Sequence, residues 1–346
     1  MNENVLRLAE KIQGLLPEEA LPIIQDRLIS PCFYDLAYLC GIIKEGRPDV
    51  PYDRVFDVLG YSPGTLKSMV SCMNDFHKVM KGDLGRRVSL GYFPLDKCLR
   101  GVRPGQVCGV MARASVGKTA FACNVVVNIF KRNNPHPVLF LSLEMPAPEI
   151  AARIFCIDNR EQPSRVEDYF SEAQGDPRVA RWARKFQDLV IVDEGSLDIA
   201  GVEKCFRDAE GYLGQRIPLV VIDYLGCIKA RGASAYERTS NAARDLKALA
   251  KKLNTAVLVL IQTSRQGGTG GDPVSLAMAR DSGVVEEACD FLLAAWRPEL
   301  SGDGEQEGLL VVSILKNRHG KTGEFFMYFD RSCLRITERD YDRGMD

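Results

Sequence analysis

The feature that most constrains the fold of this chain is a short apolar run that passes through a loop into a helical pattern. The run covers Val107 to Met111, the loop reads Ala112-Arg113-Ala114-Ser115-Val116-Gly117-Lys118-Thr119, and the helical pattern extends to Lys131. A strand, a turn and a helix that opens at Gly-Lys-Thr form the setting of a phosphate-binding loop, in which backbone N–H groups at the helix start meet phosphate oxygens. Lys118 would then neutralise the β- and γ-phosphates of ATP, and the Thr119 hydroxyl would bind Mg²⁺. The residues expected to contact the nucleotide are Ala114, Ser115, Val116, Gly117, Lys118, Thr119 and Ala120.

Short apolar runs alternate with longer helical patterns on both sides of this loop. The run from Val138 to Leu143 is followed by a helical pattern from Pro148 to Asp158. Such alternation predicts an α/β fold with a mostly parallel sheet flanked by helices. Further runs of this kind are Leu189 to Val192, Leu219 to Ile222, Ala256 to Ile261, Phe291 to Trp296 and Leu309 to Ile314.

Three polar side chains follow buried runs where strands of a parallel sheet would end. Asp223 follows Leu219 to Ile222, Glu144 follows Val138 to Leu143, and Gln262 follows Ala256 to Ile261. Ligands of open α/β sheets bind at the carboxyl ends of the strands, so we expect these side chains beside the nucleotide. Asp223 is the candidate for the Mg²⁺ shell, together with Thr119. Glu144 is the candidate base or orienting group for the attacking water, and Gln262 could report the nucleotide state to a neighbouring loop.

The first 80 residues have a different, helical pattern. Val5, Leu8, Ile12 and Leu15 repeat at steps of three and four, which predicts a small all-α domain over residues 1–80. The segment from 55 to 62 and the helix expected after it fit a helix-turn-helix or two packed helices joined by a turn. Glycines and charges in residues 81–87 predict a linker, and the α/β domain is expected to span residues 88–340.

Composition excludes few functions. Because the net charge is −1, nucleic acid would have to bind at a local basic surface. Three histidines offer few ligands for a zinc site, so metal is expected only with nucleotide. No apolar run reaches the roughly 20 residues of a bilayer span. The acidic start Met-Asn-Glu-Asn does not have the pattern of a secretory signal, so we expect a cytoplasmic protein without membrane contact.

Taken in order, these motifs resemble the C-terminal ATPase domain of DnaB-type replicative helicases. The resemblance extends over about residues 88 to 337, and an alanine at the first loop position is usual in that family. It implies a RecA-like P-loop ATPase core. The matching segments are ARASVGKT, SLEMP (142–146), IDYL (222–225), RDLKALAKKLN (244–254), IQTSR (261–265), ARDSGVVEEACD (279–290) and KNRHGKTG (316–323).

The resemblance also implies residue roles. It makes Glu144 the catalytic base, and Arg318 a finger that enters the neighbouring subunit's site with Lys316 beside it. It places Arg280, Asp281 and Gly283 on a loop that contacts DNA in a central channel, and the segment from Lys229 to Arg238, including Arg231, would be the second channel element.

The function implied is that of a DNA helicase that hydrolyses ATP at subunit interfaces, translocates on single-stranded DNA and unwinds duplex during replication. The partners expected are single-stranded DNA, further copies of the chain in a hexameric ring, and a primase or loader. An alternative is a RecA-like ATPase with a regulatory or loading role that binds DNA or protein without processive unwinding. A small-molecule P-loop kinase fits poorly, because no acceptor-site lid is recognisable.

Overall fold

The computed structural model describes residues 87–132, 135–172, 177–263, 271–274, 283–298 and 307–339. All of these belong to one compact unit, Gly85–Asp346. The predicted helical domain over residues 1–80 lies outside the described residues, as does all of the predicted linker except Arg87.

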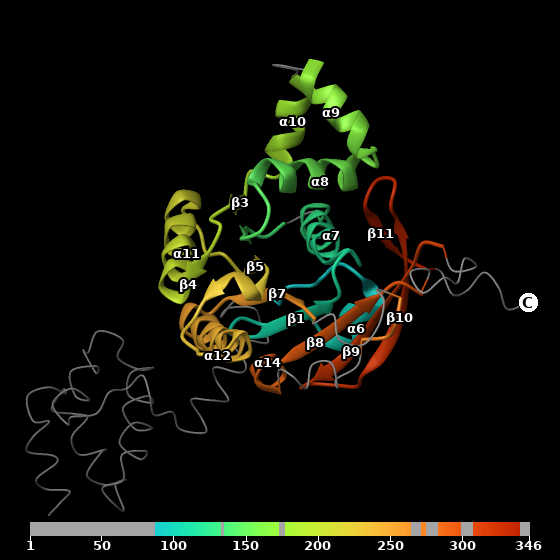
Figure 1. Ribbon diagram of the computed structural model, residues 1–346. Helices are drawn as coiled ribbons and strands as arrows, with labels where there is room; N and C mark the ends of the chain where they lie inside the picture. The colour runs from blue at the N-terminus through green and yellow to red at the C-terminus, as the bar shows by residue number, and fades with distance from the viewer. Residues whose placement is uncertain are drawn as a thin grey trace, which may run out of the picture. The chain divides into compact units, whose positions relative to one another are not determined.

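Nine strands of the described chain form one sheet in the order β11-β10-β9-β8-β1-β7-β5-β2-β3 (Figure 1). From β3 across to β8 every strand runs parallel to its neighbour, whereas β8, β9, β10 and β11 pair antiparallel. The prediction of a mostly parallel sheet is therefore confirmed, and the antiparallel part is the C-terminal addition. The strands are β1 (Val107–Ala112), β2 (Val138–Ser142), β3 (Leu189–Val192), β5 (Leu219–Asp223), β7 (Ala256–Gln262), β8 (Phe291–Trp296), β9 (Leu309–Asn317), β10 (Gly323–Asp330) and β11 (Arg335–Glu338). A second sheet pairs β4 (Leu197–Asp198) with β6 (Ile228–Lys229).

Helices cover both faces of the large sheet (Figure 1). Buried residues of α6, α7 and α8 join one apolar core, and those of α11, α12 and α14 join a second core on the opposite face. No helix in the described ranges is long and apolar enough to cross a bilayer. The helices are α6 (Phe93–Leu99), α7 (Lys118–Phe130), α8 (Ala147–Asn159), α9 (Pro163–Glu172), α10 (Pro177–Lys185), α11 (Ile199–Leu213), α12 (Ala235–Leu253) and α14 (Gly283–Ala288), with a 3-10 turn η1 (Leu225–Cys227).

Alternation along the central strands explains why both faces are covered. In β7, Leu258 and Leu260 pack into the core beneath α7, whereas Val257 and Val259 pack into the core above α12. Successive side chains of a strand point to opposite faces, so a strand that is apolar at every position must be buried on both. Each fully buried valine or leucine contributes roughly 1.5–3 kcal/mol, and this burial holds the polar strand ends in place.

The segment predicted as a channel loop, Lys229 to Arg238, is irregular only over residues 230–234, so that prediction was wrong in its extent. Lys229 ends β6, and α12 begins at Ala235. The Ser234 side chain caps α12 by accepting a hydrogen bond from the Glu237 N–H (3.1 Å). The Glu237 carboxylate in turn accepts from the Ala233 N–H (2.7 Å). This reciprocal capping starts the helix earlier than its apolar pattern indicates.

Candidate active site

The phosphate loop connects β1 to α7, and its backbone is shaped for an anion. Gly117 caps α7 with φ 116° and ψ 30°, and Ser115 also has a positive φ, of 63°. The first turn of α7 holds no acidic residue. The first N–H groups of a helix lack partners within the helix and carry the positive end of its dipole, so this terminus suits phosphate.

Lys118 and Thr119 are the first residues of α7. Thr119 links the helix to the end of β5, and Lys118 bonds to the loop. The Thr119 hydroxyl donates to the Asp223 carboxylate (2.7 Å), and the Lys118 ammonium donates to the backbone carbonyls of Ala112 and Arg113 (3.1 and 3.0 Å). Burial lowers the pKa of Lys118, and the charges of Asp223 and Glu144 partly oppose that shift. Burial raises the pKa of Asp223, and the hydrogen bond from Thr119 opposes the rise.

Glu144 reaches the same place because β2 and β5 are in register. Ser142, the last residue of β2, pairs with Asp223, and the Leu143 N–H donates to the Asp223 carbonyl (2.7 Å). The Ser142 hydroxyl then bonds the Met145 carbonyl (2.6 Å) and closes a turn that carries Glu144. Glu144 is exposed, so its carboxylate is accessible from the cavity that it lines.

A cavity of about 540 Å³ joins these residues at the carboxyl edge of the sheet. Gln262 lines it from the end of β7, in register with Ala112. Val116 is the exception among the predicted loop residues, because its side chain is buried in the core beside α7. The sequence-predicted residues that line the cavity are Ala114, Ser115, Gly117, Lys118, Thr119, Ala120, Glu144, Asp223 and Gln262.

Six further residues line the cavity that sequence reasoning did not single out as site residues: Met145, Arg153, Arg297, Phe329, Arg331 and Leu334. The Arg297 guanidinium is buried and lies 5.6 Å from the centre of the Phe329 ring. Arg297 directly follows β8 at the same edge, so the strand-end rule that found Asp223 could have found it. Phe329, Arg331 and Leu334 belong to the C-terminal hairpin and its turn, which no local sequence pattern predicted.

Lys316 and Arg318 do not line this cavity. β9 runs antiparallel to β8, so Asn317 pairs with Phe291 at the start of β8, and Phe291 also pairs with Cys108 near the start of β1. The six residues of β1 separate this edge from the phosphate loop by roughly 20 Å at 3.3 Å per residue. Within one chain, the two cations therefore lie at the edge opposite the phosphate loop.

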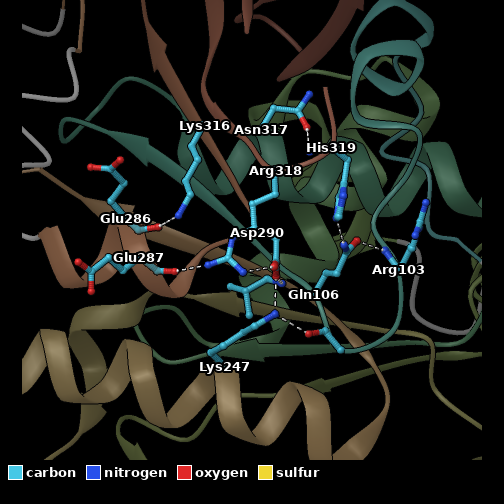
Figure 2. A network of polar contacts seen from close by, with 12 residues as sticks. Arg103, Gln106, Lys247, Glu286, Glu287, Asp290, Lys316, Asn317, Arg318 and His319 are labelled. Atoms are coloured by element: carbon cyan, nitrogen blue, oxygen red, sulfur yellow. Dashed lines mark hydrogen bonds and ion pairs between the residues drawn. The ribbon is translucent and has the colours of Figure 1, made fainter. Parts of the chain in front are cut away.

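Contacts with α14 hold both cations at that edge (Figure 2). The Lys316 ammonium donates to the Glu286 carbonyl (2.6 Å), and the Arg318 guanidinium donates to the Glu287 carbonyl (3.0 Å). Burial lowers the pKa of Lys316, and the neighbouring charge of Arg318 lowers it further.

The residues predicted to contact DNA are only partly described. Arg280 and Asp281 lie outside the described residues, whereas Gly283 begins α14, where an added Cβ would meet no atom of the described residues within 4 Å. Lys229 and Arg231 are exposed and line a shallow groove, together with Arg244 of α12.

The residues at the carboxyl edge fit a magnesium nucleotide. Magnesium in such sites is bound through one or two protein oxygens and the substrate phosphates, so Thr119 and Asp223 suffice as protein ligands. No cluster of three or more His, Cys, Asp or Glu side chains that could hold a metal ion occurs among the described residues. The fold and this edge together define a P-loop ATPase with a RecA-like core.

Comparisons with known proteins identify the family. The model of the DnaB-like helicase C-terminal domain matches residues 87–338, and the chain belongs to this family. The chain is 31% identical over 268 residues to the replicative DNA helicase DnaB of Geobacillus stearothermophilus, covering 74% of this chain and 58% of that protein. It is 32% identical over 257 residues to DnaB of Pasteurella multocida, covering 70% and 53%. The chain thus matches little more than half the length of these relatives.

Solved structures confirm the fold. A DnaB-like replicative helicase, described with its interactions with primase, superposes with a TM-score of 0.65 at 20% identity over 93% of this chain and 78% of that chain. An isolated ATPase domain gives a TM-score of 0.68 at 22% identity over 78% of this chain and 98% of that chain. At these identities the superpositions establish the RecA-like fold.

Proposed function

We propose that this protein is an ATP-dependent DNA helicase that hydrolyses ATP at the interfaces of a hexameric ring, translocates on single-stranded DNA and unwinds duplex during replication. The membership of its α/β domain in the DnaB-like helicase family supports the proposal. Such a protein would act in the cytoplasm, where its DNA is. A primase is a candidate partner, because one solved structure similar to this chain is a DnaB-like helicase described with its interactions with primase. A loader is a further candidate.

The observation that carries the proposal is the separation of Arg318 from its own phosphate loop. The phosphate loop lies at the carboxyl edge of the sheet, and Arg318 follows a strand that runs the other way. If the subunits pack so that the edge carrying Arg318 faces the carboxyl edge of the next subunit, Arg318 of one subunit meets the cavity of its neighbour. Phosphoryl transfer spreads negative charge over the transferred group, and an arginine supplied in trans is worth roughly 10³- to 10⁵-fold in rate. A shared site of this kind makes hydrolysis depend on assembly.

Within the cavity, each chain supplies the remaining groups. Lys118 would exchange its bonds to the loop carbonyls for phosphate oxygens, and Thr119 with Asp223 would hold Mg²⁺, which would neutralise charge on the phosphates. Glu144 accepts a proton from the attacking water or orients it, a role worth typically 10²- to 10⁴-fold. Gln262 ends β7 and lines the same cavity as the phosphate loop, so it is suited to signal the nucleotide state.

Contacts with the DNA backbone suit a motor that moves without reading sequence. Lys229 and Arg231 offer exposed charge, and Gly283 leaves space for a phosphate near the start of α14. Together with Arg280 and Asp281, these residues are our candidates for the channel surface.

A mixed-oligomer ATPase assay tests the shared site. Lys118→Ala and Arg318→Ala should each abolish hydrolysis, and mixing the two proteins should restore part of it. The restored sites combine an intact phosphate loop from the Arg318→Ala subunit with an intact arginine from the Lys118→Ala subunit. The absence of any recovery, in mixtures shown to co-assemble, would remove the support for Arg318 acting in trans.

A further inference from the structure

Asp290 is a buried carboxylate at the junction of α14, β8 and β1. It lies between α14 and β8 and is 4% exposed. Its carboxylate accepts from the Val107 N–H (2.8 Å), and its own N–H donates to the Val107 carbonyl (2.9 Å). Asp290 is therefore tied to the first residue of β1, the strand that leads to the phosphate loop.

The same carboxylate bonds two cations from different elements (Figure 2). Oδ2 accepts from the Lys247 ammonium of α12 (2.6 Å), and Oδ1 pairs with the Arg318 guanidinium (3.4 Å). Lys247 also donates to the Gly105 carbonyl (2.8 Å). A buried carboxylate needs compensating charge, and breaking one side of such a group is costly. The lysine and the backbone amide satisfy Oδ2, so Oδ1 remains for the arginine.

Arg318 is fixed on one side and open on the other. Its backbone N–H donates to the Asp290 carbonyl (3.1 Å), and its guanidinium contacts the Asp290 carboxylate and the Glu287 carbonyl. Its side chain is nevertheless 47% exposed. The next residue, His319, is held by Gln106 at the foot of β1 (2.6 Å between nitrogens). This arrangement sets the direction of the guanidinium while leaving donors free to face another subunit.

We infer that Asp290 is a positioning residue for the shared active site: it orients Arg318 for the phosphates bound by the neighbouring subunit. The inference rests on the proposed function, because it requires Arg318 to act in trans. Asp290 does not touch the substrate; it acts through the arginine. Removing its charge leaves the guanidinium with a carbonyl contact alone, and a misplacement of about 1 Å is enough to cost about 10²-fold in rate.

A purely structural role makes a different prediction. If Asp290 serves only to anchor β1, its loss damages the phosphate loop of its own subunit and leaves Arg318 intact for the neighbour. The two roles therefore predict different partners for recovery of an Asp290→Asn subunit in mixing experiments. A positioning role predicts recovery with Lys118→Ala, and a structural role predicts recovery with Arg318→Ala.

The test uses Asp290→Asn, which keeps the side-chain shape and an oxygen for the Val107 amide. We expect kcat to fall about 10²-fold. Mixing with Lys118→Ala should restore hydrolysis, whereas mixing with Arg318→Ala should not, because neither subunit then presents an oriented arginine.

The opposite pattern, recovery with Arg318→Ala and none with Lys118→Ala, would overturn the inference. Lys247→Met is the matched control, because it removes a partner of the same carboxylate without touching Arg318; its kcat should stay near that of the unmodified protein. If Asp290→Asn fails to fold, Asp290→Glu can replace it, because it keeps the charge on a longer side chain. It should show the same mixing pattern, with recovery in the presence of Lys118→Ala and none with Arg318→Ala. Failure of the Lys118→Ala and Arg318→Ala mixture itself would refute the shared site instead.

Discussion

Gly117→Ala should destabilise the ATPase domain through two separable effects. The backbone at Gly117 has φ 116°, a conformation that costs a residue with a Cβ roughly 1–2 kcal/mol. An added Cβ would lie 3.1 Å from the Phe329 ring, and crowding of this kind costs roughly 1–3 kcal/mol. The lower entropy of the unfolded chain returns about 0.4–1 kcal/mol. The net loss is about 1–4.6 kcal/mol, which for a domain of this size lowers Tm by roughly 2–18 °C.

Two other glycines provide controls for this measurement. Gly214 has φ 64° and open space around it, so Gly214→Ala should show the backbone cost alone, about 1 kcal/mol. Gly195 has neither a positive φ nor a close contact at the position of an added Cβ, and Gly195→Ala should be nearly neutral. Thermal unfolding without nucleotide separates these costs from any effect on binding. If Gly117→Ala costs no more than Gly214→Ala, or if Phe329→Leu does not partly relieve it, the contact between the hairpin and the phosphate loop is wrong.

Further predictions concern the two carboxylates of the site. Burial raises the pKa of Asp223 above its unfolded value, so ionisation opposes folding above the folded pKa. Asp223→Asn should therefore stabilise the nucleotide-free protein by about 1 kcal/mol at neutral pH while abolishing hydrolysis, and the gain should shrink as pH falls below the folded pKa and vanish below the unfolded pKa. Thermal melts across pH would refute this if the variant were no more stable at neutral pH. Glu144→Gln should lower kcat by about 10²- to 10⁴-fold and leave binding of a fluorescent ATP analogue unchanged; a weakened affinity with normal kcat would contradict its role as a base.

The carboxyl edge of the sheet was predictable because its signals are local. Each of Glu144, Asp223 and Gln262 directly follows an apolar run, and the parallel register brings such strand ends together. The sequence could not give the position of Arg318, because that depends on β9 pairing antiparallel with β8, a long-range choice that an apolar run does not encode.

Two other features were missed for identifiable reasons. The hairpin that brings Phe329 to Gly117 consists of half-buried strands without a turn motif that fixes their pairing, so it was not predicted. The segment from Lys229 to Arg238 was predicted as a loop although α12 begins within it, because the Ser234 cap and the bond from Ala233 to Glu237 are short-range polar contacts outside the apolar pattern.

The central claim, that the protein couples ATP hydrolysis to strand separation, is tested most directly by unwinding of a forked DNA substrate. The assay should compare the unmodified protein with Lys118→Ala, with ATPase rates measured in parallel in the presence and absence of single-stranded DNA. We expect DNA-stimulated hydrolysis and strand separation in the unmodified protein, and neither in the variant. DNA-stimulated hydrolysis without strand separation, in protein shown to assemble, would contradict the account and favour a loading or regulatory ATPase.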